Sequence, residues 1–488
     1  MSENPAPPDD LPPRYRPELI PYRFERTAWA AELHHRFAEL GPGGSTGVVV
    51  SVAGRVLLHR SFGKLAFATI RDDTGRIQLL ADSSVLDQET MNVFLDLDLG
   101  DWVGVGGEVV TTRKGELSVR VATLVLLAKA LRPLPDKWHG MVDVEARSRH
   151  RYVDLIVNEE AQRVARARST VLAELRRQFT DRGYVEVETP VLLMEATGAL
   201  ARPFLSHHEA LDLDMKLRIS LELYLKRLVV GGMERVFEIG RIFRNEGIDS
   251  THNPEFTMLE SYEALADYTD IMALVEEVFA AVALAVNGTT RLTFGGREID
   301  LTPPYRRARF MDLVAEAVGE EVPFDRPLDE MQALARRHGI EPQPAWGHGR
   351  IAAELYESLV ENQIWDPTFV VDQPKEISPL ARVHRTDPNL TERFELVIAG
   401  SEYANAFSEL VDPIDQRERF LAQARARVAG DEEAHPVDED FLRALEYGMP
   451  PTGGLGIGVD RLVMLLTDTH HIRDVILFPT LRPLSSTE

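Results

Sequence analysis

Cysteine is absent from the 488-residue sequence. Disulfide bonds, thiolate metal sites and a cysteine nucleophile are therefore excluded, and the absence fits a reducing compartment. No apolar run approaches the roughly 20 residues that a membrane-spanning helix needs. Residues 1–21 also lack the apolar segment of a secretory signal. We therefore expect a cytoplasmic protein with no membrane partner.

Several common catalytic signatures are missing as well. The sequence has no GxxxxGKS/T phosphate loop, no HExxH zinc motif and no GxSxG nucleophile motif. The glycine-rich run at residues 454–458 lies outside any βαβ unit, so it does not indicate a dinucleotide-binding loop. The neighbouring residues His207 and His208, like His470 and His471, point apart in a strand or helix, so no shared metal is expected.

Positive charge is scarce, since the formal net charge is -24. Non-specific binding to nucleic acid depends on neutralising phosphates, so we expect no DNA partner. Binding to RNA would need local basic clusters instead. The sequence offers two candidate clusters, one near the start and one near the middle: Arg55, Arg60, Lys64, Arg71 and Arg76; and Lys226, Arg227, Arg235, Arg241 and Arg244.

The length favours two or three domains. Residues 1–21 read as a flexible, proline-rich tail, and residues 22–46 contain a helix at 27–40, with Thr27 as a candidate N-cap. Short β-rich runs with turn signals between them fill residues 47–130 and predict a five-stranded barrel, with a hairpin turn at 72–75. An OB-fold is the natural candidate, and another small barrel or sandwich is the alternative.

The rest of the chain has a different character. Residues 131–155 begin with a proline-rich stretch and read as a linker. Residues 158–182 have strong helical periodicity. Strands and helices then mix without the regular alternation of a doubly wound fold, so residues 156–485 predict an α+β domain on an antiparallel sheet.

Residues 231–260 carry the most informative pattern. Two predicted strands flank a polar loop, with Arg244 and Glu246 at its entrance and His252, Asn253 and Glu255 at its exit. Such a hairpin can place an arginine on a phosphate and carboxylates near an amine. A solvated hairpin with ordinary ion pairs is the alternative.

Three motifs in order make a family resemblance specific. Residues 182–190 (RGYVEVETP), 241–246 (RIFRNE) and 454–462 (GLGIGVDRL) resemble motifs 1, 2 and 3 of the class II aminoacyl-tRNA synthetases. Residues 201–208, 222–228 and 405–410 resemble bacterial lysyl-tRNA synthetases in particular, and the resemblance runs from Tyr22 to Pro483. It implies a class II antiparallel-sheet catalytic domain preceded by an all-β OB-fold domain that binds the anticodon.

The resemblance implies a two-step reaction. Lysine and ATP form lysyl-adenylate, and lysine then passes to the 3′ end of tRNA(Lys), with release of pyrophosphate and AMP. Arg244 would contact the α-phosphate and the lysine carboxylate, and Arg461 the γ-phosphate. Nucleotide binding would also use Glu246, His252, Asn253 and Phe256, which stacks on adenine. Glu395 and Glu402 would bind Mg²⁺, whose preference is for oxygen ligands, and Glu395 would also contact ATP.

Further positions would bind lysine, since an ammonium group needs hydrogen-bonding anions. Glu409, assisted by Tyr262, would pair with the ε-ammonium, while Glu222 and Glu260 would face the α-amino end. The remaining members of the implied lysine site are Gly198, Arg244, Asn405 and Phe407. An aspartate enzyme would instead need a cation, and no arginine stands at the Glu409 position.

The resemblance also assigns the barrel and the partners. Phe67 would stack on the central anticodon base, Arg60 and Gln78 would hydrogen-bond to it, and Glu116 would contact the first base. Motif 1, which ends at Pro190, implies a homodimer. The alternative is a paralogue that transfers activated lysine to another acceptor. Four departures from the common family pattern keep that alternative open: Thr197, Leu221, Ser261 and Val411.

Overall fold

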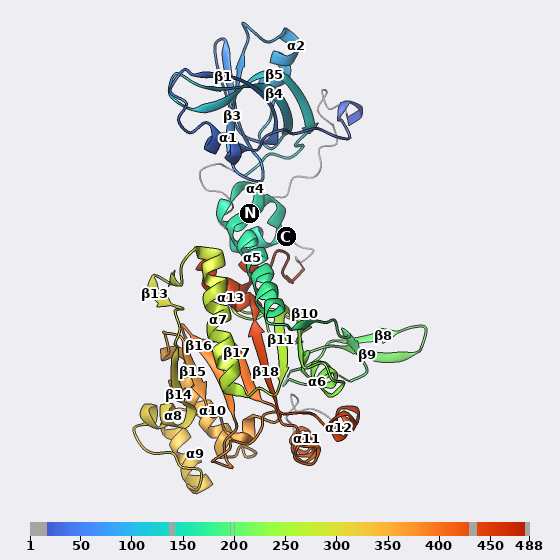
Figure 1. The fold of residues 1–488 in the computed structure, drawn as a ribbon, viewed down its shortest axis with the longest axis vertical. Coiled ribbons are helices and arrows are strands. Elements are labelled where there is room, and N and C mark those ends of the chain that lie inside the picture. The colour runs from blue at the N-terminus through green and yellow to red at the C-terminus, as the bar shows by residue number, and fades with distance from the viewer. Residues whose placement is uncertain are drawn as a thin grey trace. The chain divides into compact units, whose positions relative to one another are not determined.

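The computed structural model describes residues 17–135, 141, 143–195, 197–199, 201–428 and 437–483 (Figure 1). The chain divides into two compact units, Met1–Met141 and Val142–Glu488. Most of the predicted flexible tail lies outside the described residues, and its described end contains a short 3-10 helix at Pro17–Leu19. No helix in the described ranges is both long enough and apolar enough to cross a membrane.

The first unit is a closed five-stranded barrel, as the sequence predicts. Its strands follow one another in the order β1-β2-β3-β5-β4. Residues 102–111 form a single strand, β4, and a helix that the sequence pattern did not reveal, α2 (Gln88–Leu95), lies between β3 and β4. The other strands are β1 (Ser45–Phe62), β2 (Leu65–Arg71), β3 (Arg76–Asp82), β4 (Trp102–Thr111) and β5 (Leu117–Ala128).

The predicted N-terminal helix is shorter than expected, and its predicted cap is wrong. Helix α1 spans Ala30–Arg36, and the Thr27 hydroxyl accepts a hydrogen bond from the Ser51 amide at 2.8 Å. The first helical amide, at Ala30, donates to Asp72 Oδ2 at 2.8 Å, and the next amide donates to Thr74 Oγ1 at 3.1 Å. The β2–β3 turn therefore caps α1 from more than 40 residues away in the sequence, a partner that local sequence cannot reveal.

The second unit is built on an eight-stranded sheet in the order β14-β15-β16-β17-β18-β11-β10-β6. Neighbouring strands are antiparallel except the pairs at the two edges, β14–β15 and β10–β6. The predicted antiparallel α+β architecture is thereby confirmed. The strands are β6 (Val185–Glu186), β10 (Arg235–Phe243), β11 (Glu255–Ala264), β14 (Arg306–Arg309), β15 (Thr368–Val371), β16 (Arg393–Ile398), β17 (Ser401–Ser408) and β18 (Thr452–Gly458).

Three helices cover one face of this sheet: α5 (Glu159–Asp181), α7 (Tyr268–Asn287) and α13 (Val459–Thr467) (Figure 1). Helix α5 begins where predicted, because the Asn158 side chain caps the amide of Glu160. Its apolar stripe, including Val171, Leu175 and Phe179, is fully buried against the sheet and α7. This apolar layer holds the central strands rigidly from behind.

The opposite face of the sheet is covered only at its sides. Helices α8 (Phe310–Val318), α9 (Leu328–Arg337) and α10 (His348–Leu359) pack on β15 and β16 through Val370 and Val397. Helices α6 (Glu222–Val230), α11 (Pro413–Val428) and α12 (Glu439–Glu446) pack beside β10 and β11. The middle of this face is left for a cavity.

The remaining elements are peripheral to the sheet. Two small sheets are formed by β7-β9-β8 and by β12-β13. The short elements are α3 (Val144–Arg149), α4 (Arg151–Val157), β7 (Leu192–Leu193), β8 (Leu205–His208), β9 (Leu213–Leu217), β12 (Arg291–Phe294), β13 (Arg297–Asp300), η2 (Glu361–Gln363), η3 (Lys375–Ile377) and α14 (Ile472–Val475).

Candidate active site

Strand alternation builds the cavity. Successive side chains on a strand point to opposite faces, and on β18 the residues Leu455 and Ile457 are buried in the core behind the sheet. Glu260 and Tyr262 of β11 pair across the ladder with Gly456 and Gly454 of β18. The same two glycines pair on their other side with Asn405 and Phe407 of β17. Polar and aromatic side chains thus border a strand whose cavity face is glycine.

The glycines are needed for space. A Cβ at Gly454 would lie 1.8 Å from Glu409 Oε1 and 2.7 Å from Tyr262 Cε1. Neither neighbour is exposed at the surface, so neither can move aside easily. The glycine-rich run therefore forms the floor of a cavity of about 420 Å³. It is a strand and not a dinucleotide-binding loop, as the sequence predicts.

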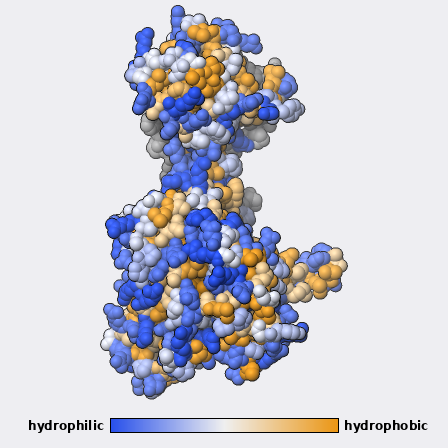
Figure 2. Space-filling model, viewed as in Figure 1, coloured by the Kyte–Doolittle hydropathy of each residue, from blue (hydrophilic) through white to orange (hydrophobic). Residues whose placement is uncertain are grey.

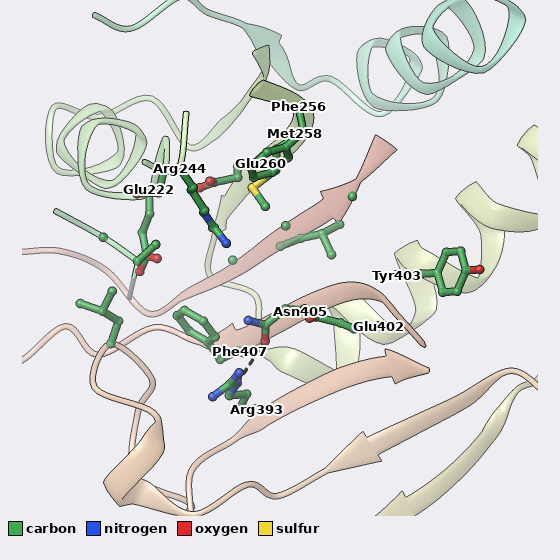
Figure 3. Close-up of a pocket in the computed structure, with 18 of the residues that line it drawn as sticks. Glu222, Arg244, Phe256, Met258, Glu260, Arg393, Glu402, Tyr403, Asn405 and Phe407 are labelled. Carbon is green, nitrogen blue, oxygen red and sulfur yellow. Dashed lines mark hydrogen bonds between the residues drawn. The ribbon is translucent and has the colours of Figure 1, made fainter. Parts of the chain in front are cut away.

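The cavity collects nearly all the residues that the sequence singled out in this unit. Of the residues that the resemblance implies for the ATP, lysine and metal sites, every one except Glu395 lines it: Gly198, Glu222, Arg244, Glu246, His252, Asn253, Phe256, Glu260, Tyr262, Glu402, Asn405, Phe407, Glu409 and Arg461. Glu395 lies beside the cavity on β16, where Arg393 donates to it at 2.6 Å. Arg393 also donates to Asn405 Oδ1 at 3.1 Å (Figure 3).

One end of the cavity is rich in arginine. Arg244 follows β10, and its guanidinium lies 5.2 Å from the centre of the Phe256 ring. Arg461, on α13, donates to the Glu402 carbonyl at 2.8 Å and approaches His252 Nε2 at 3.4 Å. The two cations converge from different elements, an arrangement that suits a polyphosphate.

Polar groups fix the framework of this end. Asp460, next to Arg461, accepts from Arg168 at 2.5 Å and from the Thr257 amide at 2.6 Å, which ties α13 to α5 and β11. His252 is held by Asp249, with 2.8 Å between Nδ1 and Oδ2. The side-chain oxygen of the buried Asn253 accepts no hydrogen bond from the described residues, so it is available to a donor on a ligand.

The other end of the cavity concentrates buried carboxylates. Glu222, Glu260 and Glu409 are 7%, 5% and 1% exposed. Glu260 accepts from the Leu221 amide at 3.0 Å and from the Tyr262 hydroxyl at 3.2 Å. Burial, reinforced by the nearby Glu222, raises the pKa of Glu260 to about 7. Burial likewise raises the pKa of Glu409 well above its usual range. Such an end favours a cationic ligand that can keep these groups ionised.

The cation nearest to these carboxylates belongs to the protein. Lys226 is fully buried, and its ammonium contacts both Glu222 and Glu409. The prediction of a basic surface cluster around it is therefore wrong. Arg244 faces the cavity, while Arg227, Arg235 and Arg241 form ion pairs with Asp438, Glu263 and Glu255. These residues are close together in the sequence, but the strands and the helix that carry them direct their side chains to different places.

Two carboxylates suit a divalent cation. Glu395 and Glu402 lie on neighbouring antiparallel strands. Burial raises the pKa of Glu395, and the negative charge of Glu402 raises it further. Both carboxylates also help to raise the pKa of Glu361 to about 7, after its own burial. The described residues contain no group of three acidic or histidine side chains placed to hold a metal, so these carboxylates would supply only part of the oxygen ligands that a hard cation such as Mg²⁺ prefers.

Three of the four departures from the family pattern make contacts that the structure shows. None of the four removes a site residue named above. Leu221 supplies the amide that binds Glu260, which a proline would lack. The Thr197 hydroxyl donates to Asp438 at 3.2 Å. Val411 packs against the apolar cluster beside the cavity. The Ser261 hydroxyl is buried without a partner among the described residues, and nothing in the structure explains it.

The four barrel residues lie close to one another. Arg60 and Phe67 are directly opposite in the β1–β2 ladder, and Gln78 on β3 accepts from Ser118 of β5 at 2.9 Å. The backbone carbonyl of Glu116 accepts from the same serine at 3.1 Å. Alternating Ala66, Ala68 and Ile70 are buried inside the barrel, so Phe67 is on the outer face, like the exposed Arg60.

The first predicted basic cluster lies only partly on the surface. Arg60, Lys64 and Arg76 are exposed, whereas Arg71 is buried.

Sequence reasoning missed three residues at these sites. Arg393 precedes Glu395 by two positions on a strand and so shares its face. Lys226 follows Glu222 by four positions on a helix and so shares its side. The exposed Phe62 lies 6.4 Å from Phe67, measured between ring centres. Each had a local spacing signal, but only the fold shows which spacing matters.

Comparison with known proteins agrees with this geometry. Residues 143–482 match the family model of class II tRNA synthetases (D, K and N), and residues 50–127 match that of the OB-fold nucleic acid binding domain. The lysine–tRNA ligase of Prochlorococcus marinus (strain MIT 9313) is 54% identical over 94% of this chain and 93% of its own. Those of Enterococcus faecalis and a Thermoanaerobacter species are 52% and 50% identical, each over 94% of this chain and 93% and 91% of their own.

Proposed function

Because the chain belongs to the class II tRNA synthetases, and within them to the lysine–tRNA ligases, we propose that its cavity makes lysyl-adenylate and its barrel binds the tRNA that receives the lysine. The observation that carries this proposal is the single cavity with arginines at one end and buried carboxylates at the other. ATP is the co-substrate. The overall reaction yields lysyl-tRNA, AMP and pyrophosphate.

Arg244 and Arg461 are the catalytic residues of the proposal. The lysine carboxylate attacks the α-phosphorus of ATP, and pyrophosphate leaves in line. Arg244, whose charge also lowers the pKa of Glu260, would neutralise charge on the α-phosphate and orient the carboxylate. Arg461 would hold the γ-phosphate. Glu246, His252, Asn253 and Phe256 would bind the rest of the nucleotide. No general base is needed, because the attacking carboxylate is already ionised.

Lysine would lie with its side chain toward Glu409. Glu409 Oε1, which has no partner among the described residues, and the Tyr262 hydroxyl are the natural partners of the ε-ammonium, since Glu409 Oε2 already contacts Lys226. Glu260 and the backbone near Gly198 would face the α-amino group, and Phe407 and Asn405 would flank the chain. Glu222 belongs to the same end. The cation at this end, Lys226, is already paired with Glu222 and Glu409, so it is not free to bind the side-chain carboxylate of an aspartate substrate.

Glu395 and Glu402 would hold Mg²⁺. When bound, the ion offsets phosphate charge during transfer. Arg393 fixes the rotamer of Glu395 and also holds Asn405, so this arginine connects the proposed metal ligands to the lysine end.

In the barrel, the outer face around Phe67 would receive the anticodon. Stacking on Phe67, with Arg60, Gln78 and Glu116 around it, is the usual recognition mode for splayed bases. This face also explains how a chain with a strongly negative net charge can bind tRNA, because exposed Arg60, Lys64 and Arg76 supply local positive charge. Transfer of lysine to a non-tRNA acceptor is not supported, because the full-length relatives are lysine–tRNA ligases.

We also propose a homodimer. Strand β6 in motif 1 is an edge of the main sheet, and Pro190 after it is exposed. Nearby apolar side chains are exposed on the projecting β7-β9-β8 sheet, whose apolar surface is visible in Figure 2: Leu192, Met194, Leu205 and Leu211. Light scattering with size-exclusion chromatography tests this, and a monomer at micromolar concentration would contradict it.

The reaction is tested by lysine-dependent exchange of pyrophosphate into ATP, followed by charging of purified tRNA(Lys). Exchange and charging are both expected. Absence of exchange would contradict the enzyme assignment, and exchange without charging would contradict the acceptor. Phe67→Ala should raise the KM for tRNA about tenfold, the cost of one lost stack, and leave the exchange reaction unchanged.

A further inference from the structure

A lysine of the protein itself lies at the closed end of the cavity. Lys226 is on α6, four residues after Glu222, and it has no exposed surface. Its ammonium nitrogen lies 2.6 Å from Glu222 Oε1 and also contacts Glu409 Oε2. It is 5.4 Å from the centre of the Phe407 ring. The chain thus brings its own ammonium to the carboxylates that are proposed to select lysine.

This ammonium carries its charge at neutral pH. Burial by itself would lower the pKa of Lys226, but Glu222 and Glu409 raise it above its ordinary value. Among the described residues, no other cation forms an ion pair with Glu222 or Glu409. A buried charge without a partner is strongly destabilising. The two carboxylates are therefore held in place by Lys226 when no substrate is bound.

A count of charges at the lysine end indicates a role for the contacts of Lys226 with Glu222 and Glu409. Glu222, Glu260 and Glu409 carry three negative charges when ionised, and Lys226 supplies one positive charge. The two negative charges that remain equal the two ammonium groups of lysine, while the substrate carboxylate is balanced by Arg244. With these groups counted, the lysine end, Arg244 and the substrate are neutral together only when Lys226 is present.

We propose that Lys226 is a positioning residue for lysine recognition, which holds Glu222 and Glu409 together and sets the net charge that a substrate with two ammonium groups neutralises. This inference rests on the proposed function and deepens it. It also changes the role expected of Glu222, since its carboxylate binds Lys226 and supports Glu409 as well as facing the substrate. The role of this lysine is inferred from its burial and its contacts.

Removing Lys226 should weaken the attraction of Glu409 for the substrate. Glu222 and Glu409 would then face each other without a cation, and such a pair takes up a proton. The other ionisable groups around them are Glu260 and Tyr262 from β11, Arg244 after β10 and Arg393 from β16. None of these four forms an ion pair with Glu409, so none replaces the lost ammonium. A protonated Glu409 has no charge to offer the ε-ammonium.

The test uses Lys226→Met, in which an unbranched apolar chain of similar length replaces the lysine. In pyrophosphate exchange, the KM for lysine should rise about 100-fold, the usual cost of breaking a buried charge pair. The KM for ATP should stay within about threefold, because the nucleotide end is unchanged. The pH below which the lysine KM rises should also move upward. An unchanged lysine KM in a folded Lys226→Met enzyme would overturn the proposal.

The double variant Glu222→Gln, Lys226→Met is the matched control, because it restores two negative charges. Its lysine KM should be at least about tenfold lower than that of Lys226→Met and no higher than that of Glu222→Gln alone, which retains only one net negative charge; a double variant with a higher lysine KM than Glu222→Gln would contradict the charge count. A double variant as poor as Lys226→Met would show a purely structural role. If Lys226→Met does not fold in a thermal unfolding assay, the comparison of the double variant with Glu222→Gln decides alone. A wild-type enzyme without lysine-dependent exchange would instead contradict the proposed function itself.

Discussion

The two ends of the cavity differ in how deeply their charged side chains are buried when no substrate is bound. At the lysine end, Glu222, Glu260, Glu409 and Lys226 are all at most 7% exposed. At the nucleotide end, the side chains of His252, Glu402 and Arg461 are 50%, 39% and 28% exposed. The charged groups at the lysine end are shielded from water, and Glu222 and Glu409 are paired with Lys226. The side chains of His252, Glu402 and Arg461 are in contact with water. Substitutions at the two ends should therefore differ in size and in the substrate that they affect.

Glu409→Gln should have the largest effect. It leaves the substrate ε-ammonium without an anion in a buried site, so the lysine KM should rise about 100-fold or more. The ATP KM should change little. Exchange kinetics with each substrate varied in turn measure both. Glu246→Gln, at the exposed end of the same cavity, is the control, and equal effects of Glu409→Gln on both KM values would refute the division into two ends.

Arg461→Lys should have a smaller effect, on ATP instead. A lysine keeps the positive charge but loses the bidentate geometry of the guanidinium. The ATP KM should rise about tenfold, because the site is partly solvated. The same exchange assay measures it. A rise in the lysine KM larger than that in the ATP KM would contradict the placement of Arg461.

Leu221→Pro should have the smallest effect. Proline has no amide proton, so Glu260 loses the 3.0 Å bond from residue 221. That bond lowers the pKa of Glu260, so its removal should raise the pKa and increase the lysine KM about threefold near neutral pH. The change should vanish about one pH unit higher. A larger effect on the ATP KM would point to a disturbed backbone, which thermal unfolding would also detect.

Much of this architecture follows from local sequence. Helix α5 has a capped start and an apolar stripe, and β10 and β11 flank a polar loop, so their positions follow from periodicity alone. The barrel follows from its short strands and turns. The site residues came from the resemblance of three motifs to a known family, and the fold then brings segments as distant as Gly198 and Arg461 to one cavity.

The remainder depends on contacts between distant segments. The cap of α1 comes from Asp72 and Thr74, so the choice of Thr27 failed. Lys226 reads as a surface cation beside Arg227, and only the fold, which brings Glu409 after β17 to the side of α6 that carries Glu222, makes it a buried counter-ion. The sequence alone does not reveal whether a charged side chain faces water, because burial is a property of the fold.

The pH dependence of the two KM values tests the contrast between the ends most directly. In the empty enzyme the pKa of Glu260 is raised to about 7, so this group gains a proton as the pH falls below 7, and lysine must displace that proton to bind. The lysine KM should therefore be lowest near pH 8 and rise about tenfold per unit below pH 7, and the ATP KM should rise less steeply over the same range. A lysine KM that stays constant from pH 6 to pH 8 would contradict a buried, proton-retaining lysine end.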